Sequence, residues 1–248
     1  MTRIVPPEPP QDFTGMPEPA TNPLNRVAYP MVTYTLLGVT ILIFILQMLS
    51  ETLLGSDYPA MLGMKENSLV VQGQIWRLLT PVFLHGSLLH IGFNMYALWV
   101  IGGRMERAYG HGKFIALYFL SAYAGNVFSF LFQPSPSLGA STAIFGLLAA
   151  EGVLLYLNRK LIHDARNMLQ NIITIGVINL IIGMTGGIDN WGHLGGLLGG
   201  LAARWRGLLS GRWRLRARRH EGGTAQRERR GERNGGEQHR SGHGLPRW

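Results

Sequence analysis

Six long apolar runs, separated by more polar connections, constrain this chain more than any other feature of its sequence. They cover residues 32–53, 88–103, 114–133, 139–157, 167–184 and 190–208. Several approach the roughly 20 residues that an α-helix needs to cross the hydrocarbon core of a bilayer. Because lipid offers the backbone no hydrogen-bond partners, helices are the only reasonable structure for these runs. The sequence therefore predicts an all-α membrane protein with a bundle of six transmembrane helices.

The distribution of basic residues predicts how these helices are oriented. The connections after the second and fourth runs are basic, with Arg104, Arg107, Lys113, Arg159, Lys160 and Arg166. The net charge of +9 comes entirely from residues 203–248, which hold thirteen Arg and four Glu. Connections rich in Lys and Arg stay on the cytoplasmic side of a membrane. We therefore expect a multi-pass protein of the cell (inner) membrane with both termini cytoplasmic and a long extracytoplasmic first loop over residues 54–87.

The two ends of the chain differ in composition from the core at residues 31–208. Residues 1–30 are Pro-rich and lack the apolar centre of a cleavable signal peptide. Residues 209–248 are rich in Arg and Gly and poor in apolar side chains. Both segments are predicted to be disordered. For the basic tail we favour anionic lipid as the partner, with RNA as the less supported alternative, so nucleic acid is not an expected partner.

Four polar residues lie inside the apolar runs, where polar groups are costly and usually mark function or hydrogen bonds between helices. His90 and Asn94 are one helical turn apart in the second run, Ser141 begins the fourth, and His193 lies near the start of the sixth. The predicted topology places all four in the outer half of the bilayer. His193 could then act as general base to Ser141, while His90 and Asn94 donate hydrogen bonds to an oxyanion.

Small residues and an aromatic ring support a close approach of Ser141 and His193. Gly196 lies one turn after His193, in a run of glycines of the kind that lets helices pack closely, and Gly139 precedes Ser141. Phe145 lies one turn after Ser141 and could stack on the imidazole ring. Close packing alone would also explain the glycines, so the combination of residues carries the prediction.

Simpler interpretations apply to each polar residue taken alone. A serine in an apolar helix more often bonds to the backbone, and two histidines could join helices or bind a metal. The runs suggest no carboxylate at the depth of these histidines and no plausible Asp or Glu third member near His193, so no metal site is expected. The chain has no cysteine, which excludes disulfides and thiolate metal sites, and no cofactor is expected.

Five motifs share an order and spacing that make chance resemblance improbable. They are Trp76-Arg77, the set His85, His90 and Asn94, the pattern Gly103-Arg-Met-Glu106, Gly139-Ala-Ser141 and His193-Leu-Gly-Gly. On these residues the sequence resembles the rhomboid family of intramembrane serine proteases from residue 31 to about 206. Two departures are Thr142, where many members have Gly, and Phe145, where some have Tyr. Thr142 should fit if the backbone there is helical.

The resemblance implies a serine endopeptidase with Ser141 as nucleophile and His193 as its only catalytic partner. His90, Asn94 and the Ser141 backbone N–H would form the oxyanion hole. The substrates would be single-span membrane proteins, cut within or beside the transmembrane segment. A loosely held fifth span would admit them.

Five other residues have expected roles outside the chemistry of the pair or at its edge. Trp76 and Arg77 are expected to brace the first loop, and Glu106 to bind N–H groups at its end of the second span. Glu151 is taken as structural. His85 is expected at the mouth of the site, where it could hold water or substrate or make a loop hydrogen bond.

Two other function classes are alternatives to a protease. A rhomboid-like binder without activity typically lacks the serine or the histidine, and this chain has both. A transporter or channel requires polar positions through both leaflets, but Asn126 and Asn179 are the only obvious additions. The protease interpretation is therefore preferred.

Overall fold

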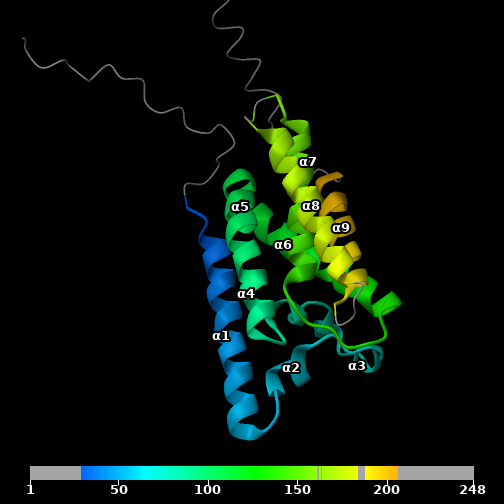
Figure 1. Cartoon of the computed structure of the whole chain (residues 1–248). Coiled ribbons are helices and arrows are strands. Elements are labelled where there is room, and N and C mark those ends of the chain that lie inside the picture. Colours follow the sequence, from blue (N-terminus) through cyan, green and yellow to red (C-terminus); the bar gives the residue numbers. More distant parts are fainter. Residues whose placement is uncertain (1–28, 161, 163, 184–187, 206–248) are drawn as a thin grey trace, which may run out of the picture. The chain divides into compact units, whose positions relative to one another are not determined.

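The computed structural model describes residues 29–160, 162, 164–183 and 188–205, and over these residues the chain is helical (Figure 1). This described part contains one isolated antiparallel bridge, between Lys65 and Ser137, and no strand. The chain divides into two units, Met1–Ala202 and Ala203–Trp248, and the description below concerns the first. The terminal segments predicted to be disordered fall almost wholly outside the described residues.

The helices follow the apolar runs closely. The helices of the bundle are α1 (Met31–Leu54), α4 (Leu88–Ala97), α5 (Gly103–Tyr109), α6 (His111–Phe132), α7 (Ser141–Leu157), α8 (Ala165–Gly183) and α9 (Asn190–Trp205). A π turn over Leu98–Gly102 joins α4 to α5, so residues 88–109 form one helical rod. The connection between α1 and α4 holds α2 (Tyr58–Gly63), α3 (Asn67–Val71) and 3₁₀ turns at Ile75–Leu78 and Thr80–Phe83.

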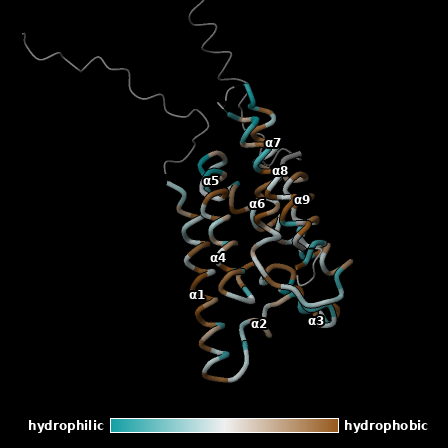
Figure 2. Tube along the Cα trace, viewed as in Figure 1, coloured by the Kyte–Doolittle hydropathy of each residue, from teal (hydrophilic) through white to brown (hydrophobic). Residues whose placement is uncertain are grey.

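Two of the described helices, α1 and α6, are long and apolar enough to cross a membrane, and α7 is a shorter apolar helix. Figure 2 shows hydrophobic residues along most of α1, where side chains such as Leu42 and Leu46 are about half exposed. The rod at 88–109 is divided by its π turn, and polar residues such as Asn171 and Asn179 lower the apolarity of α8. The six-span arrangement therefore stays a prediction.

Small residues bring α6, α7 and α9 close together. A Cβ atom added at Gly125 of α6 would lie 2.6 Å from the Thr142 Cβ of α7, and one added at Gly195 of α9 would lie 2.5 Å from the Phe128 Cβ of α6. A Cβ at Gly146 of α7 would overlap Ser121 of α6. Such contacts leave no room for a methyl group. The distances between the axes of α6, α7 and α9 are therefore short because glycine occupies these contact positions.

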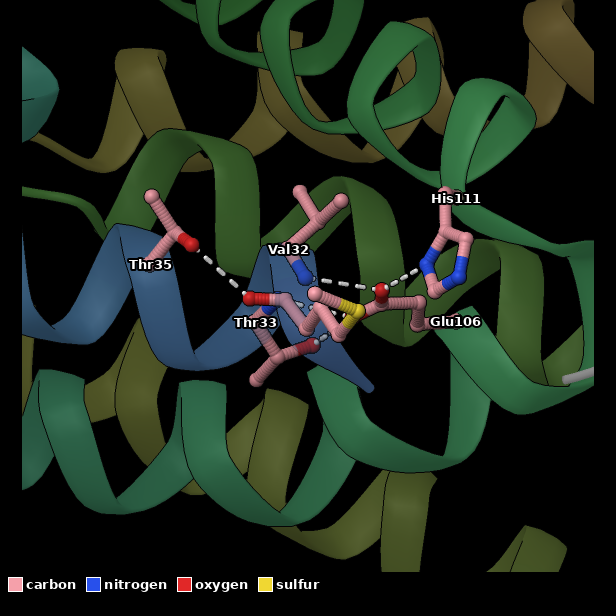
Figure 3. A network of polar contacts seen from close by, with 6 residues as sticks. Val32, Thr33, Thr35, Glu106 and His111 are labelled. Atoms are coloured by element: carbon pink, nitrogen blue, oxygen red, sulfur yellow. Dashed lines mark hydrogen bonds and ion pairs between the residues drawn. The ribbon is translucent and has the colours of Figure 1, made fainter. Parts of the chain in front are cut away.

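A buried carboxylate fixes the start of α1 (Figure 3). Glu106 on α5 is 0 % exposed and accepts hydrogen bonds from the Val32 N–H at 2.8 Å and the Thr33 N–H at 2.7 Å. The Thr33 hydroxyl donates to it at 2.6 Å, and His111 Nδ1 lies against its other oxygen. First-turn N–H groups lack partners within their own helix. The predicted role of Glu106 is confirmed, because it supplies those partners from another helix.

Trp76 and Arg77 brace the first connection, as predicted. The Trp76 indole donates to the Leu62 carbonyl at 3.2 Å. The Arg77 guanidinium donates to the carbonyls of Met61 and Met64, both at 2.8 Å. One buried cation therefore joins the end of α2 to the 3₁₀ turn that follows α3.

Glu151 on α7 is 2 % exposed and forms an ion pair with Arg104 on α5. The Arg104 Nε–Glu151 Oε1 distance is 2.6 Å, and Nη2 bonds to the other carboxylate oxygen at 3.1 Å. This two-point contact confirms the structural interpretation of Glu151 and joins two helices at the end of the bundle that holds Glu106.

Replacing Glu106 by Gln should lower the free energy of unfolding by roughly 1–3 kcal/mol, because an amide nitrogen would face N–H donors and leave one unsatisfied. Thermal unfolding in detergent measures the effect. Glu51→Gln, on the exposed surface of α1, is the matched control and should change the stability by less than about 0.5 kcal/mol. Equal losses in the two variants would contradict the role given to Glu106.

Candidate active site

The polar residues singled out in the sequence gather around one cavity of about 860 Å³. The cavity is lined by α4, the connection before α7, and α7, α8 and α9. Its lining includes Ser141, His193, His90, Asn94 and Phe145. Residues about 100 positions apart in the sequence therefore line the same cavity.

Ser141 and His193 are in direct contact. Ser141 is the first residue of α7, and His193 lies in the first turn of α9. The distance from Ser141 Oγ to His193 Nε2 is 2.9 Å, within the range of a hydrogen bond. His193 is 4 % exposed, so the imidazole sits in a largely dry environment. A serine hydroxyl bonded to a neutral imidazole can pass its proton to that ring as the oxygen attacks a carbonyl.

The backbones of α7 and α9 touch beside this pair. A Cβ atom added at Gly196 would overlap the Thr142 carbonyl oxygen, and one added at Gly200 would overlap the Gly146 carbonyl oxygen. Gly196 and Gly200 lie on one face of α9, one turn apart. This face therefore sets the separation of the two helices that carry Ser141 and His193.

A parallel ring holds the imidazole. The centroids of the Phe145 and His193 rings are 4.1 Å apart and their planes differ by 9°, which is a stacked arrangement. Within the described residues, His193 Nδ1 has no hydrogen-bond partner. The stack and the helix packing therefore orient the ring where a carboxylate would otherwise do so.

His90 and Asn94 are both on α4, and they line the cavity together with Ser141 of α7. A Cβ atom at Gly139 would be 2.8 Å from His90 Nε2 and 3.6 Å from Ser141 Oγ, so the His90 ring lies against the backbone just before Ser141. Asn94 Nδ2 donates to the His90 carbonyl at 2.9 Å, which uses one of its two protons. Gly139 has φ +135°, a conformation that glycine adopts easily and that opens space for the His90 ring.

The start of α7 adds further donors. Ala140 precedes Ser141 at the N-cap position, and within the described residues no side chain caps this helix. The first N–H groups of a helix lack internal partners and carry a partial positive charge. The N-terminus of α7 at the cavity can therefore stabilise a developing negative charge.

His85 is not at the mouth of the site, which corrects the sequence-based expectation. The residue is 1 % exposed, and its Nε2 accepts a hydrogen bond from the Ala140 N–H at 3.4 Å. Burial, with a smaller effect of His90, lowers the pKa of His85 to about 3, so its imidazole is neutral and can accept this bond. Of the roles considered, the loop hydrogen bond describes it.

Sequence reasoning also overlooked Asp189. Its side chain accepts a hydrogen bond from the Gly192 N–H at 2.8 Å and so caps the start of α9, four residues before His193. An Asp immediately before a helix is a recognised capping signal that could have revealed it. The statement that no carboxylate shares the depth of the histidines was therefore wrong, although Asp189 makes no hydrogen bond to His193 Nδ1 in the described part of the chain. Among the described residues, no group of three or more potential ligands is placed to hold a metal ion.

Comparison with known proteins gives a consistent set of matches. A family model of the Rhomboid domain matches residues 72–210. The chain is similar to Rhomboid protease GluP of Bacillus subtilis (strain 168), with 44 % identity over 178 residues, which is 70 % of this chain and 34 % of that protein. Rhomboid-like protease 1 of Toxoplasma gondii and RHOMBOID-like protein 5 of Arabidopsis thaliana are each 39 % identical over 153 residues. Each of these two matches covers 60 % of this chain and 50 % of the relative, so the chain spans between a third and a half of the length of the three proteins.

Gly196→Ala should lower the free energy of unfolding by about 1–3 kcal/mol, because its methyl group would force the backbones of α7 and α9 apart. Gly38→Ala is the matched control, since a Cβ at Gly38 on α1 has nothing within 4 Å. This control should leave the stability unchanged or raise it by up to about 1 kcal/mol, the helix-propensity difference. Thermal unfolding of both variants distinguishes packing from helix propensity, and a stable Gly196→Ala would rule out a tight contact.

Proposed function

This chain belongs to the rhomboid family, and from this premise we propose that it is an intramembrane serine endopeptidase that uses Ser141 and His193. The observation that carries the proposal is the 2.9 Å contact between Ser141 Oγ and His193 Nε2 at a cavity. The two residues come from separate helices, α7 and α9, whose backbones are in contact at Gly196 and Gly200 of α9. A serine bonded merely to its own helix would not need this arrangement.

In the first half of the proposed reaction, Ser141 Oγ attacks the carbonyl carbon of the substrate peptide. Its proton passes to His193 Nε2 as the new C–O bond forms. The tetrahedral intermediate then collapses, the C–N bond breaks, and His193 gives the proton to the leaving amine. The product of this half is an ester between Ser141 and the N-terminal part of the substrate.

In the second half, water enters the position of the departed amine. His193 takes a proton from this water as its oxygen attacks the ester carbonyl. The proton returns to Ser141 Oγ when the ester bond breaks. The Phe145 stack keeps Nε2 directed at Ser141 Oγ throughout, which supports a two-residue mechanism because no described residue is hydrogen-bonded to His193 Nδ1.

We assign the oxyanion to the space between α4 and the N-terminus of α7. The Ser141 N–H, the second amide proton of Asn94 and an N–H of the His90 ring are the proposed donors. Asn94 is held by its bond to the His90 carbonyl, and His90 is held against Gly139, so the donors are positioned before the substrate arrives. Preorganised donors of this kind contribute most where water is excluded.

The finer features of the proposal concern topology and substrate. Six spans with both termini cytoplasmic place the cavity in the outer half of the cell membrane. The substrates are then single-span membrane proteins cut within or next to their transmembrane segment, and α8 is the side of entry. The core at 31–208 carries the activity, and the basic tail at 209–248 binds anionic lipid.

The positions of the other polar residues argue against a transport path. Asn126 is 1 % exposed, and its amide donates to the Leu78 carbonyl at 3.1 Å. Asn179 donates to the Ile175 carbonyl of its own turn at 2.8 Å. Both amides thus donate to backbone carbonyls, and both residues line the cavity that holds Ser141, so they do not mark a separate polar path.

Ser141→Ala and His193→Ala should each lower turnover by roughly a thousandfold or more, and the double variant should be little worse, because the two residues act as one unit. The measurement is cleavage of a single-span reporter in proteoliposomes, with fragments mapped by mass. A fluorophosphonate probe should label the wild-type chain and not Ser141→Ala.

Ser68→Ala is the matched control, because Ser68 is an exposed serine of the first connection, bonded to Glu66. It should keep wild-type turnover and labelling. Wild-type turnover by Ser141→Ala would exclude the serine-protease mechanism.

Asn94→Ala should lower the turnover number by roughly ten- to a thousandfold, the range for removing one oxyanion donor, with little change in KM. Steady-state kinetics on the same reporter separate the two parameters. An unchanged turnover number with a raised KM would instead assign Asn94 to substrate contact.

A further inference from the structure

Lys65 is fully buried in the first connection although it carries a charge. It is 0 % exposed, and its ammonium donates to the carbonyls of Gln133 and Ser135, both at 2.8 Å. Two residues later, the Asn67 amide donates to the carbonyls of Phe130 at 3.0 Å and Gln133 at 3.2 Å. Four hydrogen bonds thus converge on the carbonyls of three residues between 130 and 135, and we name Lys65 and Asn67 the Lys-x-Asn clamp.

The clamp binds the C-terminal end of α6. This helix ends at Phe132, and the last carbonyls of a helix have no partner within it and carry a partial negative charge. A buried ammonium is suited to that end because it supplies both donors and a positive charge. The carbonyls at Phe130 and Gln133 are therefore satisfied from outside the helix, by a connection that lies more than 60 residues earlier.

The same backbone leads directly into the catalytic serine. Only eight residues, 133–140, separate α6 from Ser141. Lys65 and Ser137 exchange backbone hydrogen bonds of 2.9 and 3.0 Å, and the Gly139 N–H donates to the Pro81 carbonyl at 2.9 Å. Residues 133 and 135–139 also line the cavity. The position of this segment therefore determines where Ser141 lies.

The charge of Lys65 also faces the second catalytic helix. Burial lowers the pKa of Lys65 below its ordinary value, and the carboxylates of Asp189 and Glu66 oppose that effect. Asp189 caps α9 one turn before His193. Lys65 thus bonds to the segment that carries Ser141 and interacts electrostatically with the residue that starts the His193 helix.

From these contacts we propose that Lys65 is a positioning residue, which holds the 133–140 segment so that Ser141 meets both His193 and the substrate. The inference rests on the proposed protease function. It goes further because it gives a role in catalysis to a residue that belongs to none of the five sequence motifs. Lys65 is also not among the residues that line the cavity. Lys65 acts through the backbone of the segment and touches no reacting atom.

The test compares Lys65→Met, which keeps the length of the side chain but removes its donors, with Lys65→Arg, which keeps charge and donors. Lys160→Met, on an exposed lysine, is the control. We measure the rate of fluorophosphonate labelling of Ser141, the turnover of the reporter and the thermal midpoint, with rates taken well below that midpoint. The labelling rate reports on Ser141 in folded molecules, so a purely structural role would not change it.

Lys65→Met should lower both labelling and turnover by about ten- to a hundredfold, the effect of a displacement near 1 Å. Lys65→Arg should recover part of the loss, and Lys160→Met should match the wild type. If Lys65→Met does not fold, Asn67→Ala removes the two hydrogen bonds that Asn67 adds to the clamp and should lower both rates by roughly two- to tenfold.

Wild-type labelling and turnover in folded Lys65→Met, or in Asn67→Ala where Lys65→Met does not fold, would overturn the inference and leave the proposed function intact. A wild-type chain that is neither labelled nor active would overturn the proposed function, and this inference with it.

Discussion

The contact between the backbones of α7 and α9 is the interaction on which the site depends. Gly196 and Gly200 lie against the carbonyls of Thr142 and Gly146, with no side chain between the helices. In lipid, where burial of apolar surface gives helices little reason to associate, such van der Waals contact is a main source of attraction. The same contact brings Ser141 Oγ to 2.9 Å from His193 Nε2. Helix association and the geometry of the pair therefore have one cause.

Charged side chains that are buried or partly buried stabilise both ends of the bundle, through different contacts. At one end, Glu106 and the Glu151–Arg104 pair fix α1, α5 and α7 relative to one another. At the other end, Arg77 and Lys65 donate to backbone carbonyls of irregular segments. Glu106, Arg77 and Lys65 each satisfy backbone groups that secondary structure leaves unpaired, whereas Glu151 and Arg104 satisfy each other.

Much of this arrangement was predictable from the sequence, because apolar runs and motif spacing are local properties. Over the described residues the runs predicted the bundle helices to within three residues at each end, except that the second helical rod continues from the predicted residue 103 to Tyr109. Helical spacing placed Phe145 and Gly196 beside the pair. The depth of His85 was not predictable, since its burial depends on contacts with Gln47 and Ala140, 38 and 55 positions away. The π turn at Leu98–Gly102 and the reach of Lys65 to Ser135 also depend on tertiary packing, which no spacing rule encodes.

Thr142 shows how packing accommodates a departure from the family pattern. Its backbone is helical, as the sequence analysis required, and it is 5 % exposed. The side chain occupies space that two glycines leave open: a Cβ at Gly125 on α6 would lie 2.6 Å from the Thr142 Cβ, and one at Gly192 on α9 would lie 3.1 Å from its Cγ2. A larger residue next to Ser141 is thus compensated by the absence of side chains at Gly125 and Gly192 on the neighbouring helices. The Thr142 carbonyl still packs directly against Gly196, so the methyl and hydroxyl groups of Thr142 do not separate α7 from α9. The packing depends on the summed volume of the side chains at positions 125, 142 and 192, where α6, α7 and α9 meet. A glycine after Ser141 is only one way to keep that volume small.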